Sequence, residues 1–144
     1  MANYIETKVK FNKVQENGTV KKVTEPYLVD ALSFTEAEAR IIEEVTPYIS
    51  GDFSVSAVKK TNISEIFWDA RGDKFYNVKV VFITIDEKSA KERRKASHIL
   101  VQASSFKDAY DNFIEGMKGT IADYEIAAIS ETAIMDVYQI KSEE

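Results

Sequence analysis

Apolar and polar residues alternate at the start of the chain. In YIETKVKF, residues 4–11, Ile5, Val9 and Phe11 fall on one face of an extended segment, and the residues between them include two lysines and a glutamate. A period of two indicates a strand with one buried face. The dipeptide Asn17-Gly18 follows and is typical of a tight turn. The pattern therefore predicts a hairpin that leads into a second strand at PYLVDAL, residues 26–32.

Two later segments have the period of a helix. Each begins with a serine followed three residues later by an acidic residue, the spacing of a capping box. The apolar positions then recur every three or four residues, which predicts one buried face on each helix. These positions are Phe34, Ala37, Ile41 and Val45 in the first segment and Phe106, Ala109, Phe113 and Met117 in the second.

A long strand is predicted after each helix, over residues 52–68 and residues 123–138. Between them, the segment FYNVKVVFITI, residues 75–85, is apolar on both alternating sets of positions. Such a strand is expected to be covered on both faces. Packing of a sheet face against a second copy would cover it, so we expect a homo-oligomer.

The chain also repeats itself. LVDALSF begins at Leu28 and is echoed by LVQASSF, which begins at Leu100, and further matches continue in the same order on either side of this pair with a slightly smaller offset. We therefore expect a tandem duplication with units of about residues 1–70 and 71–144, together forming a single domain over residues 1–144. The predicted fold is α+β: two tandem ββαβ repeats forming a two-layer antiparallel sheet with helices on one face, a ferredoxin-like variant.

Composition narrows the chemistry. The 144 residues include no cysteine, which excludes disulfides, thiolate metal sites and cysteine nucleophiles. The net charge of −5 argues against nucleic-acid binding through the whole surface. No signal sequence and no apolar run of membrane-spanning length stands out, so a cytoplasmic protein without membrane contact is expected.

In each predicted repeat, the first segment is basic and the segment that contains the helix is acidic. Residues 1–24 carry a net charge of +3 and residues 74–98 a net charge of +4, whereas residues 25–73 and 99–144 carry −6 each. The basic segments could contact a phosphate-bearing ligand or nucleic acid, or they could be solvated hairpin tips that protect strand edges. The candidate contact residues are Lys21, Lys22, Lys88, Lys91, Arg93, Arg94, Lys95 and His98.

No catalytic constellation is recognisable. The chain has one histidine, and it lacks a glycine-rich phosphate loop. We therefore expect no catalytic residue, no cofactor and no metal site, and a non-enzymatic binding or regulatory protein of unknown ligand. The alternatives are a nucleic-acid or nucleotide-binding protein that uses the basic hairpins, and a structural or assembly protein.

Three phrases carry a family resemblance: TEPYLVDALSFTEAEARIIEE, EGMKGTIADY and ISETAIMDV. In these the sequence resembles an uncharacterised domain-of-unknown-function family of small proteins from Bacteroidetes and their mobile elements. The resemblance extends over nearly the whole chain. It implies a bacterial or phage-related cytosolic protein and assigns a role to no residue.

Overall fold

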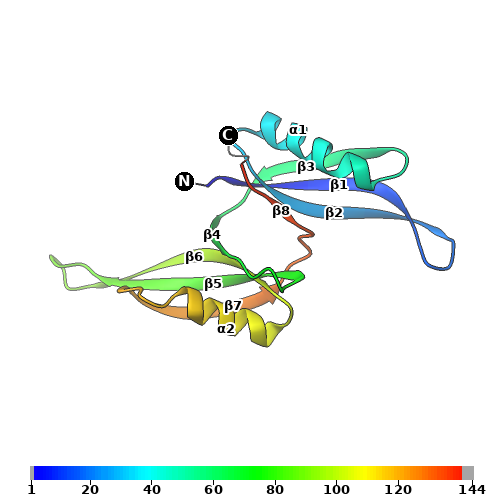
Figure 1. Ribbon diagram of the computed structural model, residues 1–144. Helices are drawn as coiled ribbons and strands as arrows, with labels where there is room; N and C mark the ends of the chain where they lie inside the picture. The colour runs from blue at the N-terminus through cyan, green and yellow to red at the C-terminus, as the bar shows by residue number, and fades with distance from the viewer. Residues whose placement is uncertain (1, 141–144) are drawn as a thin grey trace, which may run out of the picture. The chain divides into compact units, whose positions relative to one another are not determined.

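The segments with a period of two form strands, and the two segments with a helical period form helices. In the computed structural model, which describes residues 2–140, the protein is mixed α+β, as predicted (Figure 1). The strands are β1 (Tyr4–Val14), β2 (Val20–Asp30), β3 (Phe53–Lys60), β4 (Ile63–Phe67), β5 (Lys74–Ile85), β6 (Glu92–Ala103), β7 (Asp123–Glu131) and β8 (Val137–Tyr138). The helices are α1 (Phe34–Val45) and α2 (Phe106–Gly116), and a short 3-10 helix, η1 (Thr46–Tyr48), follows α1.

The chain divides into two compact units, each with its own sheet and helix. Unit 1 contains the residues up to Thr61 and those from Ala133 onward, and unit 2 is residues 62–132. The sheet of unit 1 has the strand order β3-β1-β2-β8, and the sheet of unit 2 has the order β4-β6-β5-β7. The structure thus has two four-stranded sheets with one helix each, where the sequence predicted one sheet carrying both helices.

The last part of each predicted repeat joins the sheet that is built mainly from the other repeat. β4 follows β3 along the chain but pairs with β6 of unit 2, and β8 follows β7 but pairs with β2 of unit 1. Both of these pairings are parallel, so neither sheet is fully antiparallel. The prediction of single long strands at residues 52–68 and 123–138 is therefore wrong: each segment is two strands that hydrogen-bond in different sheets.

A threonine marks the end of pairing in each case. The Oγ1 of Thr61 donates to the carbonyl oxygen of Tyr4 at 2.8 Å, and the Oγ1 of Thr132 donates to that of Phe75, also at 2.8 Å. These two bonds occupy equivalent positions in the predicted repeat. The register shift in the β1–β3 pair, next to Lys8, likewise recurs in the β5–β7 pair, next to Lys79. The two units are therefore built with the same local bonds.

Each helix begins where the capping serine predicts. The Oγ of Ser33 accepts the backbone N–H of Glu36 at 3.1 Å, and the Oγ of Ser105 accepts that of Asp108 at 3.2 Å. The apolar face of each helix packs on its own sheet (Figure 1). The core of unit 1 includes Ile5, Val9, Val29, Ala37, Ile41 and Val45, and that of unit 2 includes Val78, Val80, Ile99, Val101, Phe113 and Met117.

The first hairpin turns as predicted, and within the single chain β5 is buried over only part of its length. Gly18, in the loop between β1 and β2, has a φ of +84°, which a glycine adopts without strain. On β5, Val78 and Val80 are fully buried, but Ile85 is 71% exposed. Within residues 2–140, neither helix combines the length and apolar composition that crossing a membrane requires.

Candidate functional site

The predicted basic residues are divided between the units. Lys21 and Lys22 lie on β2 in unit 1, where both are exposed. Lys21 pairs directly across the hairpin with Lys13. Two like charges in facing positions repel each other, so this end of the hairpin gains no stability from its lysines. The other six candidates, residues 88–98, lie in unit 2 on β6 and in the loop before it.

The two arginines among these candidates are neutralised by neighbouring carboxylates. Arg93 pairs with Asp86 at 3.1 Å, and Arg94 pairs with Glu92 at 2.9 Å. Arg94 also pairs with Glu125 of β7, reaching across β5, which lies between the two strands. The hydrogen bond from Arg94 to Glu125 raises the pKa of the guanidinium. Both guanidinium groups are therefore already engaged by anions.

The remaining basic candidates have fewer contacts. Lys88, Lys91 and Lys95 form no ion pair with any residue in the range 2–140. The Nδ1 of His98 lies 3.2 Å from the side-chain nitrogen of Asn77, which donates to it in the tautomer that leaves Nδ1 unprotonated. Nowhere in the described part of the chain do three or more potential metal ligands gather. The hairpin of β5 and β6, here called the basic hairpin of unit 2, therefore has a basic surface whose charge is partly neutralised by carboxylates.

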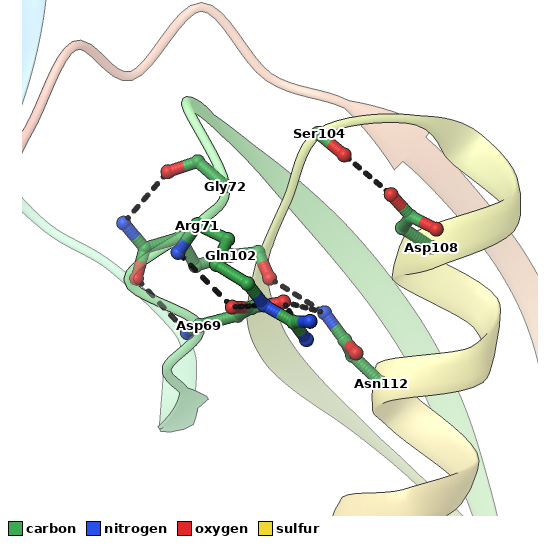
Figure 2. Close-up of polar contacts among 7 residues, drawn as sticks. All are labelled: Asp69, Arg71, Gly72, Gln102, Ser104, Asp108 and Asn112. Atoms are coloured by element: carbon green, nitrogen blue, oxygen red, sulfur yellow. Dashed lines mark hydrogen bonds and ion pairs between the residues drawn. The ribbon is translucent and has the colours of Figure 1, made fainter.

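A second polar cluster lies where β4 turns into β5, and Figure 2 shows its members pointing toward one another. The carboxylate of Asp69 accepts hydrogen bonds from the Nε of Arg71 at 3.1 Å and from the Nδ2 of Asn112 on α2 at 3.0 Å. The hydrogen bonds from Arg71, with that from Asn112, hold the pKa of Asp69 at about 2, below its ordinary value. The carboxylate is therefore ionised throughout the neutral range.

Gln102 closes this cluster from β6. Its Oε1 accepts the backbone N–H of Asp69 at 3.0 Å, and its Nε2 donates to the carbonyl oxygen of Gly72 at 3.1 Å (Figure 2). A hollow of about 400 Å³ lies beside the cluster and is lined in part by Trp68. The polar groups of the cluster form hydrogen bonds with one another. The cluster is therefore suited to holding the loop between β4 and β5 against α2 rather than to binding a ligand.

The pocket in unit 1 has different properties. It has a volume of about 540 Å³, within the range of small-molecule sites. It lies past the C-terminal end of α1 and is walled by β1, β2, η1 and the segment leading into β8. Its main lining residues are Phe11, Lys13, Glu25, Tyr27, Tyr48 and Tyr138.

Aromatic rings form much of the pocket wall. Tyr138 stacks on Tyr27 with the ring centroids 6.1 Å apart. The guanidinium of Arg40 lies over the Tyr138 ring, 5.7 Å from its centroid. Tyr48, on η1, is 85% exposed. The pocket thus has a fixed pair of stacked rings and one ring that is open to solvent.

The polar groups of the pocket are few. The hydroxyl of Tyr27 donates to the Oε1 of Glu25 at 3.1 Å, and the Nζ of Lys13 lies 3.9 Å from the Oε2 of the same carboxylate. Burial, reinforced by the charge of Glu25, raises the pKa of Tyr27 well above its ordinary value. Burial and the carboxylate of Asp136 raise the pKa of Tyr138 to about 12. Both hydroxyls are therefore protonated donors at neutral pH.

Two positions of α2 carry larger side chains than the matching positions of α1. In the alignment of the two repeats, Phe113 and Met117 stand at the positions of Ile41 and Val45. The ring of Phe113 packs against those of Phe67 and Tyr124, with centroids 6.0 Å and 5.9 Å apart. Of the two α1 residues, Val45 lines the pocket of unit 1, and Ile41 lies in the core.

Sequence analysis did not identify the pocket residues. Tyr27, Tyr48 and Tyr138 come from three separate segments, and β8 is too short for its partner strand to be predicted. A signal was available in the predicted repeat, which aligns Val45, a residue of the pocket wall, with the larger Met117.

Comparison with known proteins identified one family. A family model described as a domain of unknown function (DUF4494) matches residues 3–140. The comparisons with curated proteins and with solved structures found no match.

Proposed function

The chain belongs to this family of unknown function, and we propose from its own structure that it is a non-catalytic binding protein whose ligand site is the unit 1 pocket. The observation that carries the proposal is a pocket of about 540 Å³ whose wall includes Val45, at the position where α2 has the larger Met117. The smaller side chain of Val45 leaves more open space beside the tyrosines that line the pocket.

The chemistry of the wall also favours binding. The pocket combines three tyrosines with a small number of charged groups, the usual composition of a site that orients a small molecule. A catalytic role would need a nucleophile or a base within hydrogen-bond reach of a second reacting group. Glu25 instead accepts a hydrogen bond from the hydroxyl of Tyr27. The raised pKa of Tyr27 keeps this hydroxyl protonated, so Tyr27 does not act as a base.

We further propose that the two units arose by duplication of one ββαβ repeat, after which they diverged in function. The matching threonine bonds, helix caps and register shifts support this history. On this proposal, unit 2 has a filled core and unit 1 has a pocket. Several properties stay predictions from the sequence: a ferredoxin-like variant of the fold, a single-domain organisation, a homo-oligomeric state, a cytoplasmic location, and a bacterial or mobile-element origin.

The test is ligand-observed NMR with a mixture of three small aromatic probes: phenethylamine, phenethyl alcohol and hydrocinnamate. The variant Val45→Met places the unit 2 residue in the pocket wall and should reduce saturation transfer to every bound probe at least about fivefold. Asn112→Ala, in unit 2, is the matched control and should leave the transfer unchanged. Absence of transfer to all three probes, or equal transfer with Val45→Met, would contradict the proposal.

The alternative functions are tested on the same sample. Light scattering measures whether the protein is a homo-oligomer, as the assembly alternative requires. Titration with nucleic acid tests the alternative in which the basic hairpins bind phosphates, and its expected result is given in the Discussion.

A further inference from the structure

We propose that the unit 1 pocket takes a small organic cation, an ammonium or guanidinium group carried on an apolar body. This inference rests on the proposed function and adds to it the chemical class of the ligand. It is carried by two carboxylates and four aromatic rings that line the same pocket.

The two carboxylates reach the pocket from neighbouring segments. Glu25 lies on β2, two residues before Tyr27 and on the same face of the strand. Asp136 directly precedes β8, and its carbonyl oxygen accepts the N–H of Leu28 at 3.1 Å. The N–H of Met135 donates to the carbonyl oxygen of Pro26 at 2.9 Å. These backbone bonds hold the Asp136 segment beside the strand that carries Glu25.

Neither carboxylate is fully neutralised. Glu25 is largely buried, with 16% of its side chain exposed, yet the ammonium nitrogen of Lys13 is 3.9 Å away, beyond hydrogen-bond distance. The Lys13 side chain is 54% exposed and can move into solvent. The Oδ1 of Asp136 accepts the N–H of Val137 at 2.8 Å, and its Oδ2 has no hydrogen bond within residues 2–140. Two carboxylates thus line the pocket against one ammonium group.

The other cation near the pocket is committed elsewhere. Arg40 donates to Glu44 at 2.8 Å and to the carbonyl oxygen of Gln139 at 2.9 Å. Its guanidinium lies over the ring of Tyr138, so this ring already takes part in one cation–π contact. An anionic ligand would therefore find one cationic side chain in the pocket wall, the exposed Lys13, whereas a cation would find two carboxylates.

The aromatic wall suits the same ligand. A cation held over tyrosine or phenylalanine rings is attracted by their negative faces, and carboxylates at the rim add a charge-assisted hydrogen bond. Burial raises the pKa of Tyr27 most, and the negative charges of Glu25 and Asp136 raise it further. Tyr48, which is exposed on η1, can close over a bound apolar body.

The experiment titrates the full-length protein separately with phenethylamine, phenethyl alcohol and hydrocinnamate, which share a ring and differ in charge. Backbone NMR shifts of Tyr27 and Tyr138 report binding. We expect phenethylamine to bind at least about tenfold more tightly than phenethyl alcohol, equivalent to about 1.4 kcal/mol, and hydrocinnamate to bind most weakly.

Two variants of similar size assign the effect to the proposed groups. Glu25→Gln keeps an acceptor for Tyr27 and should bring the affinity for phenethylamine down to that for phenethyl alcohol. Lys13→Met removes the competing ammonium and should strengthen phenethylamine binding, a change opposite in sign that misfolding would not produce. Urea unfolding of both variants checks that they are folded.

The outcomes separate the two proposals. Equal affinity for the amine and the alcohol, or tighter binding of hydrocinnamate, would overturn the cation inference and leave the pocket as a binding site. Binding of none of the three probes would overturn both.

Discussion

Tyr138, next to the last described residues of the chain, stacks on Tyr27 of β2 with the ring planes 23° apart. This contact joins the shortest strand of unit 1 to the wall of its pocket. Because β8 contributes only two residues to the sheet, its position depends on side-chain packing as much as on backbone hydrogen bonds.

The first prediction concerns this ring. Tyr138→Ala removes the stacking partner of Tyr27 and should destabilise unit 1 by about 2 kcal/mol, less than for a fully buried aromatic residue. Tyr138→Phe keeps the ring and should change the free energy of unfolding by less than about 0.5 kcal/mol. Hydrogen exchange of the α1 amides measures both. Equal effects of the two variants would mean that the hydroxyl, rather than the ring, stabilises the strand.

The second prediction concerns alkaline pH. Burial raises the pKa values of Tyr27 and Tyr138 in the folded protein, that of Tyr138 to about 12, so the folded state favours their neutral forms. Their contribution to stability is complete below pH of about 10, the pKa of an unfolded tyrosine, and is lost as the pH rises through the folded values. Chemical denaturation at stepped pH should therefore show stability falling above pH of about 10. The double variant with phenylalanine at both positions should flatten this fall, and an unchanged slope would contradict the assignment.

The third prediction follows from the strand exchange. Deleting residues 133–144 removes β8, including the buried Val137, from the sheet of unit 1. Amide protection in unit 1 should fall at least about tenfold, while protection in residues 62–132 should persist. An equal loss in both units would show that β8 stabilises the chain as a whole.

A circular permutant should restore the amide protection that the deletion removes from unit 1. In unit 2, β4 precedes β5 along the chain, and residues 68–73 connect them. Placing residues 133–140 ahead of residue 3 through a linker of the same length gives unit 1 the connectivity of unit 2. This permutant should recover the amide protection of unit 1.

The fourth prediction concerns the cluster around Asp69. Asn112→Ala removes hydrogen bonds to the Asp69 carboxylate and to the carbonyl oxygen of Gln102, and should cost about 1 kcal/mol. The pKa of Asp69 is lowered to about 2, so its contribution is complete above the unfolded value of about 4 and is lost as the pH falls through 2. Urea unfolding should show the free energy of unfolding falling as the pH is lowered between these values, and Asp69→Asn should remove this fall. Ligand binding in unit 1 should not change in either variant.

The fifth prediction concerns the basic hairpin. Because Arg93 and Arg94 are paired with carboxylates, we expect no saturable binding of labelled single-stranded DNA or RNA at about 200 mM salt, and only weak binding at about 50 mM. Fluorescence anisotropy measures this. Tight binding that weakens steeply with salt, and is abolished in the Arg93→Glu, Arg94→Glu double variant, would instead favour the nucleic-acid alternative.

The sequence by itself determined the local elements of both units. Ser33 and Ser105 marked the helix starts because capping is a contact between residues three apart, and Asn17-Gly18 marked the first turn because glycine accepts a positive φ. The alternating pattern of residues 4–11 located β1, since side-chain alternation is a property of a single strand.

Only the tertiary structure decided where β4 and β8 pair and where a pocket remains. Hydrogen bonds in a sheet join segments far apart in the chain, and a strand's own pattern does not say which backbone it meets. Val137 thus pairs with Leu28 of the other repeat, and Ile66 with Leu100. The pocket also depends on this long-range pairing, because Tyr27, Tyr48 and Tyr138 line one space only after β8 has joined the sheet of unit 1.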